Sequence, residues 1–600
     1  MARTMRKKYF LIALIVIIAG SLIATGIITN FYRNKGSGPV VQPPQNNSST
    51  STIDKDLADL GVQETPGGKV APPTSTPDSG KKNNGGGGNQ IAGYGLIYYV
   101  RTGGGTASQC TGRVNADYPG TGSNQPCAFK HPFIALPPQG TPILKGGDTL
   151  IIGNGSYMMG YGAIGAEKCQ QGGSYDCVMA GIPSGPSVSA PTRILGANWN
   201  TGCAIKPELY GVERSWAIFD LTKSSNVKIE CLEITDHNSC IEKSGESGCP
   251  RDAAPYGQWA AVGLYASDSN NVFLKNLNIH GLANSGIHAG RISNWRLEGV
   301  RLAANGLAGF DGDIPGGSSN SGTITFKKVK VEWNGCGETY PGGAPTDCTD
   351  ESAGGYGDGL GTGATGGNWV IEDSFFTHNT QDGLDLLYHT KGGIITLKRV
   401  KAEGNAGNQI KTSGNLIMSD SLVAANCGYF DGKPFTKSVS ACRAAGNALS
   451  VQLSQATDKV SLINNSLYGQ GDCLVIAQRS GGGSGIVRSL NNIFLGDYQY
   501  GKGTEASCLF WSDQNSITFD NSYSVIYGVK DLDSACPAGS HNICKDPLLT
   551  SIGPAGFNLR PKNESPAVND GLYAAGVTSI DYTGKKRPKI NVDIGAYEAD

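Results

Sequence analysis

The residue types best suited to chemistry in this sequence are three aspartates and a lysine that follow Gly- or Asn-rich turns. They stand in the segments DGLG at Asp358, DGLD at Asp382 and Asp385, and NQIK ending at Lys411. Clustered carboxylates repel one another unless a cation joins them, and Ca²⁺ prefers such oxygen ligands. The three carboxylates therefore indicate a calcium site, with the amine of Lys411 beside it.

A constant spacing relates these groups to one another. Six residues separate an Asn from an ionisable group in three segments: Asn305 and Asp311, Asn379 and Asp385, and Asn405 and Lys411. If each Asn marks the same corner of a repeating turn, the three ionisable groups lie in one column. Asp358 and Asp382, which are 24 residues apart and each open a DGL triplet, would form a second column beside it.

Short repeated strands must position these columns. From Asn226 onward, segments such as NVKIECLEIT, NWVIEDSFFTHN and GIITLKRVKAEGN each hold two runs of alternating apolar residues around a polar bend. Most of them begin roughly 21–29 residues after the last, with turn residues at the corners and almost no helical pattern. The pattern predicts an all-β fold, a right-handed parallel β-helix (solenoid) with N- and C-terminal caps. Neighbouring turns of this coil, called rungs, are expected about 4.8 Å apart.

Two regions precede the predicted coil. Residues 1–9 form a basic segment that we expect in the cytoplasm, and residues 10–29 carry no charge over a length that can span a bilayer. We expect a transmembrane helix there, either an uncleaved anchor or a signal segment. Residues 30–92 are rich in Pro, Ser, Thr, Asn and Gly, which predicts a disordered linker. The parallel β-helix domain is expected over 93–545 and a C-terminal cap segment over 546–600.

Composition narrows the compartment and the partners. The 16 cysteines all follow the linker and have no CxxC spacing, so we expect disulfides and a body outside the cytoplasm. Lys+Arg 49 nearly balance Asp+Glu 50, so no overall field favours nucleic acid. We expect a monomer at the cell surface, or a secreted one if the N-terminal segment is cleaved. Several cysteine neighbours bracket loop-like sequence and predict local bridges: Cys169/Cys177, Cys240/Cys249, Cys336/Cys348 and Cys427/Cys442.

The segments GDGLG, NTQDGLDLLY and GNAGNQIK resemble the family 9 polysaccharide lyases, Ca²⁺-dependent enzymes with a pectate-lyase-like β-helix. The resemblance implies that Asp358, Asp382 and Asp385 are calcium ligands and that Lys411 is the general base. Gln381 stands where the family usually has another Asp, and its amide oxygen can also ligate calcium. The implied activity is β-elimination in an acidic, pectate-like polysaccharide. In that reaction calcium acidifies the C5 proton of a uronate, and the lysine removes it.

Other interpretations of the same residues stay open. The aspartates could satisfy the backbone of turns, with Lys411 paired to Asp385 in a structural role. Paired acids, Asp311 with Asp313 or Asp382 with Asp385, could serve a glycoside hydrolase. The anchor and the long linker also fit a non-catalytic carbohydrate-binding protein or adhesin at the cell surface.

Three further residues are candidates for substrate binding. Asp311 belongs to the predicted column, and His288 falls near its end. Arg443 follows the cysteine-bracketed loop and could clamp the carboxylate of a sugar, although a surface arginine is the ordinary alternative. Two aromatic residues, Tyr388 and Trp369, could stack on sugar rings or fill the interior of the coil, and for Trp369 we expect the interior.

Overall fold

The structure is a computed structural model. It describes residues 95–600 apart from 171–174, 243–248, 250–254, 351–355, 481–484, 498–507, 514–516, 531–535, 537–540, 554–555 and 600. All described residues belong to one compact unit, Thr52–Asp600. The predicted basic segment, 1–9, the predicted membrane segment, 10–29, and the predicted linker, 30–92, lie outside the described residues. Within the described part, no helix has both the length and the apolar character needed to cross a bilayer.

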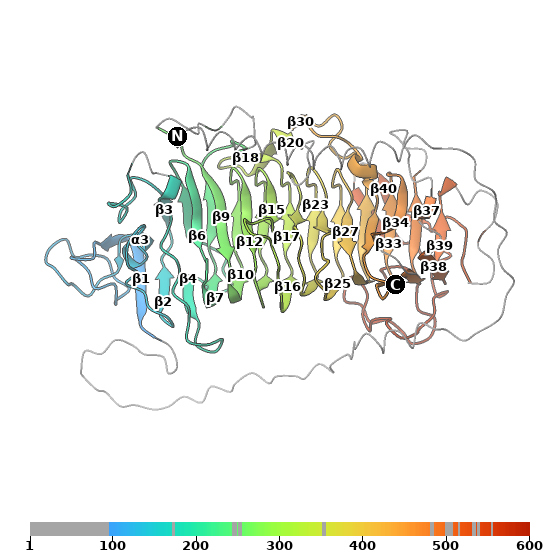
Figure 1. Ribbon diagram of the computed structural model, residues 1–600, viewed down its shortest axis with the longest axis horizontal. Helices are drawn as coiled ribbons and strands as arrows, with labels where there is room; N and C mark the ends of the chain where they lie inside the picture. Colours follow the sequence, from blue (N-terminus) through green and yellow to red (C-terminus); the bar gives the residue numbers. More distant parts are fainter. Residues whose placement is uncertain are drawn as a thin grey trace, which may run out of the picture. The chain divides into compact units, whose positions relative to one another are not determined.

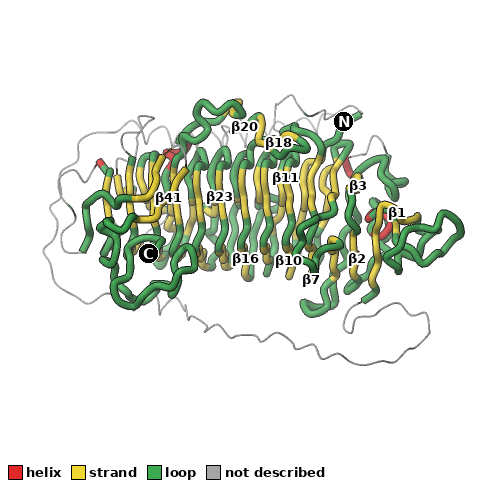
Figure 2. Tube along the Cα trace, turned by 180° about the vertical axis from the view of Figure 1, so that it is seen from behind, coloured by secondary structure: helices red, strands yellow, loops and turns green. Residues whose placement is uncertain are grey.

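Three long parallel sheets make up the coil within the described residues. Figure 1 shows their strands side by side in sequence order, and Figure 2 shows the same stack from behind. Parallel connections of this kind are right-handed in about 98% of cases, so the coil is a right-handed parallel β-helix. The predicted all-β solenoid is confirmed.

Within each sheet, neighbouring strands follow one another in sequence order. The first sheet contains β1 (Ile97–Gly105), β2 (Thr149–Ile152), β4 (Thr192–Gly196), β7 (Ser225–Glu230), β10 (Asn270–Lys275), β13 (Arg296–Glu298), β16 (Thr323–Lys327), β22 (Asn368–Glu372), β25 (Ile394–Lys398), β28 (Asn415–Ser419), β32 (Lys459–Ile463), β35 (Gly485–Leu490) and β38 (Ile517–Ser522). The second contains β3 (Ser156–Met159), β5 (Glu208–Gly211), β8 (Glu233–Asp236), β11 (Asn278–His280), β14 (Arg301–Ala303), β17 (Lys330–Glu332), β23 (Phe375–Thr377), β26 (Lys401–Glu403), β29 (Leu422–Ala425), β33 (Ser466–Gly469), β36 (Ile493–Gly496) and β39 (Val525–Tyr527). The third contains β6 (Ser215–Asp220), β9 (Ala260–Ser267), β12 (Ser285–Gly290), β15 (Ala308–Asp311), β21 (Leu360–Gly361), β24 (Leu384–Leu386), β27 (Ile410–Ser413), β31 (Leu449–Leu453), β34 (Cys473–Arg479) and β37 (Cys508–Ser512).

Alternation of apolar and polar residues decides which side chains enter the coil. In β16, Ile324 and Phe326 are fully buried, while the residues between them are partly exposed, as expected for a strand with one face in the core. Trp369, whose ring lies 6.1 Å from that of Phe326, is also fully buried. The expectation that Trp369 fills the interior is confirmed.

A buried ladder of asparagines fixes one corner of the coil. The Asn305 Nδ2 atom donates to Asn334 Oδ1 at 3.0 Å, and Asn334 Nδ2 donates to Asn379 Oδ1 at 2.9 Å. Asn379 Nδ2 then donates to Asn405 Oδ1 at 2.8 Å, and Asn405 Nδ2 to Gln409 Oε1 at 2.8 Å. Stacked amides of this kind satisfy one another and their turns in a dry interior. Asn305, Asn379 and Asn405, from which the six-residue spacing is counted, therefore lie at the same corner of the coil. Asn334 occupies this corner as well.

Two insertions rise from the coil between rungs, and both carry the predicted disulfides. Cys336 bonds to Cys348 and Cys427 to Cys442, and the other predicted pairs, 169–177 and 240–249, also form. The first insertion contains the antiparallel hairpin β18 (Gly337–Thr339) and β19 (Ala344–Thr346). Its last strand, β20 (Cys348–Thr349), pairs with β30 (Thr436–Ser438) of the second insertion, so the two insertions support each other.

A histidine holds the first insertion against the second sheet. His280 Nδ1 lies 2.6 Å from Glu338 Oε1, and its Nε2 lies 2.9 Å from Glu233 Oε1. Burial alone would lower the pKa of His280, but the two glutamates raise it to about 9. The imidazole is therefore protonated at neutral pH and bridges two carboxylates.

A short helix packs beside the first strands of the coil, and the final segment packs along the side of the later rungs. The short helix α3 (Pro132–Ala135) packs at the N-terminal end with all of its residues buried. At the C-terminal end the hairpin β40 (Leu549–Gly553) and β41 (Gly556–Pro561) follows the last rungs. The fully buried Arg587 joins this final segment to the coil because its Nη2 atom lies 2.9 Å from Asp420 Oδ1. Arg587 also pairs with Glu598.

Candidate functional site

The third sheet brings the predicted site residues into one column. Asp311 pairs with Gly361, Gly361 with Asp385, and Asp385 with Lys411 along β15, β21, β24 and β27. The structure thus has the column that the asparagine spacing predicts, with Gly361 inside it. Asp358 lies next to this column, because its Oδ1 atom accepts a hydrogen bond from the backbone N–H of Asp382 at 3.0 Å.

Lys411 lies between two carboxylates. Its Nζ atom is 2.9 Å from Asp382 Oδ2 and 2.6 Å from Asp385 Oδ2, and its side chain is 18% exposed. Asp358, Asp382 and Asp385 each offer an oxygen, and these three atoms lie within 4.8 Å of one another. Four groups that are far apart in sequence therefore converge on one small volume, where the neighbouring strands β21, β24 and β27 of the third sheet begin.

Burial and mutual charge set the protonation of this group. Burial raises the pKa of Asp358 well above its ordinary value, and the nearby Asp382 and Asp385 raise it further. Burial would lower the pKa of Lys411, but the three aspartates raise it well above the usual lysine range. Lys411 is therefore an ammonium in the absence of another cation. In this state it can hold the carboxylates together but cannot accept a proton.

The group opens into a cavity of about 340 Å³. Besides the three aspartates and Lys411, the wall includes the predicted residues Gln381, Asp311 and Arg443, together with Asp313, Thr362 and Tyr388. Tyr388 is 54% exposed, so its ring is available at the rim. Of the two roles open to Tyr388, its position agrees with contact to a sugar and not with packing in the interior.

His288 occupies a different position from the rest. It continues the column one rung beyond Asp311, with which it is paired in β12 and β15. Its Nε2 atom lies 3.0 Å from the carbonyl oxygen of Asp313 and 3.5 Å from Asp311 Oδ2. The cavity wall does not include His288. It therefore supports the acidic residues at that end of the cavity.

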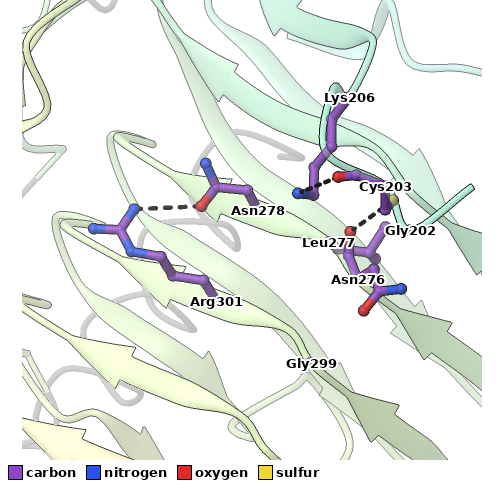
Figure 3. A pocket seen from close by; sticks show the side chains of 8 residues that line it. All are labelled: Gly202, Cys203, Lys206, Asn276, Leu277, Asn278, Gly299 and Arg301. Atoms are coloured by element: carbon purple, nitrogen blue, oxygen red, sulfur yellow. Dashed lines mark hydrogen bonds between the residues drawn. The ribbon is translucent and has the colours of Figure 1, made fainter. Parts of the chain in front are cut away.

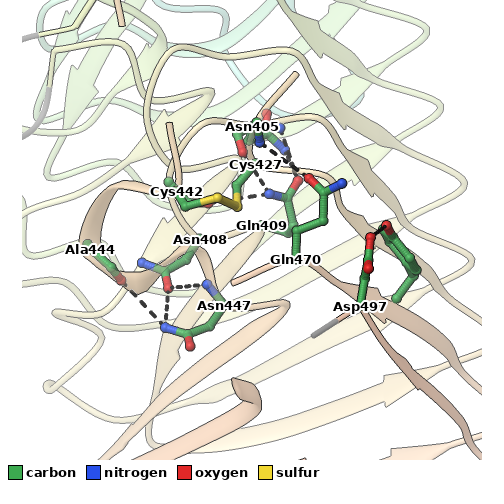
Figure 4. The surroundings of a disulfide bond; sticks show 12 residues. Asn405, Asn408, Gln409, Cys427, Cys442, Ala444, Asn447, Gln470 and Asp497 are labelled. Atoms are coloured by element: carbon green, nitrogen blue, oxygen red, sulfur yellow. Dashed lines mark hydrogen bonds between the residues drawn. A yellow bond between two sulfur atoms is a disulfide. The ribbon is translucent and has the colours of Figure 1, made fainter. Parts of the chain in front are cut away.

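The second insertion delivers Arg443 to the cavity. Arg443 opens the short 3-10 helix η2 (Arg443–Gly446), in which Ala444 and Ala445 have φ values of 49° and 71°. Left-handed backbone at residues with a Cβ costs energy and needs support from its surroundings. Figure 4 shows that support: the Cys427–Cys442 disulfide precedes the turn, and Asn447 Nδ2 donates to Asn408 Oδ1 at 2.7 Å behind it.

The donor set fits a hard divalent cation. When all three acids are ionised, the three carboxylates and one ammonium have a net charge of −2, which a divalent cation would balance. Carboxylate oxygens are the ligands Ca²⁺ prefers, and it completes its shell of about 6–8 oxygens with neutral groups and water. Thr362 adds a hydroxyl that is buried on the cavity wall, and no residue that the structure describes hydrogen-bonds to it.

A second hollow, of about 280 Å³, lies on another part of the coil and contains no acid in its wall. Figure 3 shows Lys206 and Arg301 on either side of Asn278. Arg301 is already paired with Glu332 at 2.7 Å, and Lys206 Nζ donates to the carbonyl oxygen of Cys203 at 3.2 Å. This hollow has no group suited to acid–base work.

Sequence reasoning misses Thr362 and part of the role of Asp313. Thr362 follows the DGLG segment by one residue, but a threonine in a Gly-rich turn gives no chemical signal by itself. The sequence suggests Asp313 only as a hydrolase acid, whereas its backbone N–H donates to Asp311 Oδ1 at 2.8 Å and so orients that residue.

Comparison with known proteins finds only remote likeness, and only among solved structures. No family model and no curated protein matches the chain. Three of the similar solved structures are pectate lyase Pel9A, a rhamnogalacturonan lyase and an alginate lyase from Paenibacillus sp. str. FPU-7. Pel9A is 14% identical over 84% of this chain and 97% of its own, with a TM-score of 0.36. The rhamnogalacturonan lyase is 13% identical over 82% of this chain and 99% of its own, with a TM-score of 0.36. The alginate lyase is 13% identical over 64% of this chain and 93% of its own, with a TM-score of 0.31.

All three are β-helix proteins. At these identities and TM-scores the likeness carries no argument about the reaction, so the argument for a function comes from the residues of the cavity.

Proposed function

We propose that this protein is a Ca²⁺-dependent polysaccharide lyase that cleaves a uronate-containing, pectate-like polysaccharide by β-elimination. The observation that carries the proposal is the convergence of Lys411 with Asp358, Asp382 and Asp385 in an open cavity. A purely structural ion pair needs neither a third buried acid nor a cavity beside it.

The cation would be held by Asp358, Asp382 and Asp385, with Gln381 and Thr362 as neutral oxygens beside them. When bound, Ca²⁺ would hold the uronate carboxylate and so make the C5 proton more acidic. It would also neutralise the aspartates that raise the pKa of Lys411, so that the lysine could lose its proton.

The lysine and its neighbours would then act on the sugar. Neutral Lys411 removes the C5 proton, the C5–H electron pair becomes the C4–C5 double bond, and the C4–O bond breaks. The leaving oxygen takes a proton from water. Arg443, at the wall of the cavity, suits the carboxylate of a neighbouring sugar because a guanidinium matches carboxylate geometry.

The hydrolase alternative that uses Asp382 and Asp385 has less support. An acid and a base for glycoside hydrolysis must act independently on either side of the bond. Asp382 and Asp385 are joined through the same ammonium, which leaves neither free for that work.

The test is a screen of pectate, alginate and glycosaminoglycans for unsaturated products, which absorb at about 232–235 nm after elimination. We expect activity with calcium and none with a chelator. Lys411→Ala and Lys411→Arg should both be inactive, since arginine keeps the positive charge but cannot lose its proton at neutral pH. Full activity in Lys411→Arg, or activity indifferent to the chelator, would contradict the proposal.

A further inference from the structure

Beyond the cavity, the column that contains Lys411 continues through three more rungs. Lys411 pairs with Ser450, Ser450 with Ile476, and Ile476 with Trp511, along β27, β31, β34 and β37. Alternation in a strand puts these residues on the same outward face of the third sheet. Trp511 therefore stands directly in line with the proposed base.

Trp511 differs from the other large residues of this face in its exposure. It is 36% exposed, and no aromatic or cation–π contact involves its ring among the residues that the structure describes. Single exposed apolar side chains are ordinary on protein surfaces. What distinguishes Trp511 is its register with Lys411, together with the Cys473–Cys508 disulfide that ties its strand to the preceding rung.

The residues between Lys411 and Trp511 in this column carry no charge, which suits a sugar chain. Ser450 is small and buried, and Ile476 is partly exposed. Next to them, Gln452 and Gln478 pair in the adjacent outward positions, and their amides can donate to and accept from hydroxyl groups.

Charge favours this direction over the opposite one. From Lys411 toward the N-terminal rungs the column contains Asp385 and Asp311, with Asp313 beside them. Asp311 and Asp313 are not among the proposed ligands of the cation, so they repel the carboxylates of a uronate polymer. From Lys411 toward Trp511 the column contains no acid.

We propose that Trp511 is a sugar-stacking subsite that holds the polysaccharide about three units away from the sugar on which Lys411 acts. Rungs advance about 4.8 Å, and an extended 1,4-linked pyranose chain advances roughly 5 Å per unit, so three rungs match three sugars. The C–H face of a pyranose packs against an indole ring, and tryptophan supplies that contact at little cost in side-chain freedom. The proposal rests on the proposed function for its choice of ligand, an acidic 1,4-linked polysaccharide.

The test uses substrate length. Oligouronates of two to eight units are prepared from the polymer that the intact protein degrades, or from pectate if it degrades none. We expect Trp511→Ala to raise KM about tenfold for oligomers of five or more units, with kcat unchanged and with dimers and trimers unaffected. Trp511→Phe should restore most of the affinity for long oligomers.

Tyr527→Ala is the matched control, because Tyr527 is 46% exposed but belongs to β39 of the second sheet. It should behave as the intact protein at every length. Equal losses at all lengths in Trp511→Ala, or no loss with long oligomers, would overturn the subsite.

Calorimetric binding of the same oligomers to the intact protein in chelator separates this proposal from the proposed function. Length-dependent binding that is lost in Trp511→Ala, in a protein that cuts no uronan when calcium is present, would support the subsite and refute the lyase. Elimination without any effect of Trp511 would do the reverse. A protein that neither cuts nor binds would overturn both.

Discussion

At the scale of single residues, the site consists of charges whose protonation is set by their neighbours. Lys411 has two roles that exclude each other: as an ammonium it cancels part of the acidic charge, and as an amine it can accept a proton. Which role it has depends on whether another positive charge satisfies Asp382 and Asp385. The protonation state of Lys411 therefore depends on whether a cation binds Asp382 and Asp385 in its place.

Substitution of Asp358 should test whether a cation binds at the three aspartates. Burial and the two neighbouring aspartates raise its pKa, so its ionised form costs stability when no cation is bound. Asp358→Asn keeps the oxygen that accepts the Asp382 N–H but removes a negative charge. In chelator at pH 8 we expect the variant to be more stable than the intact protein by about 1 kcal/mol. Its affinity for calcium should fall at least about tenfold, because ligand charge sets affinity in such sites.

Thermal melting in chelator and calorimetric titration with CaCl₂ check these two effects. Asp313→Asn is the control, since Asp313 lines the same cavity but does not belong to the three-acid group. A loss of stability in Asp358→Asn, or equal calcium affinity in the two variants, would argue against a cation at this position.

At the scale of elements, the insertions are docked onto the coil by histidines in two different electrical states. His280 is charged between Glu233 and Glu338, with a pKa of about 9. His378 stacks between Trp333 and Tyr429, and burial, assisted by Lys401 and Lys433, lowers its pKa to about 4. The first contact is electrostatic and the second is a packing contact, so pH should affect only the first above neutrality.

This difference gives a pH prediction. Because the pKa of His280 is raised in the folded protein, its contribution is fully present below the unfolded value of about 6.5 and is lost as pH rises through about 9. The stability lost in His280→Gln should therefore be about 3 kcal/mol at pH 6 and shrink toward zero by pH 10. Urea unfolding from pH 6 to pH 10 measures it.

His378→Gln provides the comparison above pH 8, where the imidazole is neutral in both the folded and the unfolded protein. The cost of this substitution should be the same at pH 8 and at pH 10. If the cost of His280→Gln were equally constant, the ion pairs with Glu233 and Glu338 would not be what holds the first insertion.

At the scale of the whole molecule, a few buried contacts connect segments that are distant in sequence. The contact from Arg587 to Asp420 joins the final segment to the middle of the coil. Burial raises the pKa of Asp420, while Arg587 lowers it, so the acid depends on this partner. Removing only one member of a fully buried pair leaves a charge without compensation, which costs about 3–5 kcal/mol.

Arg587→Met should therefore release the final segment before the coil unfolds. We expect protease cleavage within 560–599 at temperatures where the intact protein resists. The double variant Arg587→Met/Asp420→Leu removes both charges of this pair and leaves only Glu598 without its partner, so it should recover part of the loss. A double variant as sensitive as the single one would mean that shape, and not charge, holds the segment.

The parts of the molecule that the sequence predicts are those governed by local repetition. The spacing from each Asn to an ionisable group predicts the column of Asp311, Asp385 and Lys411, because both belong to one turn of the coil. Nearby cysteines predict their bridges for the same reason. Contacts between distant turns leave no such local signal. The sequence therefore does not indicate Cys203–Cys231, Cys473–Cys508 or the contact of His280 with Glu338.

The coil begins earlier in the chain than the regular sequence repeat does. A regular repeat can be recognised only from Asn226, whereas parallel pairing already begins with β1 and β2 at Ile97 and Thr149. The long connection between these strands hides the repeat, since the spacing there follows the loops and not the rungs. The sequence also does not show how far a side chain extends, so only the structure reveals that Lys411 contacts both Asp382 and Asp385.

The paired insertions, joined by β20 and β30, have a consequence for how such a protein can change over generations. Because they leave the coil at its corners, they can lengthen, shorten or alter their residues while the strands beneath keep their register. Selection can thus remodel the rim around the cavity, including the approach to Arg443, without disturbing the acids at its base. Proteins that descend from this chain can therefore differ in the ligands that enter the cavity while keeping the same acids at its base.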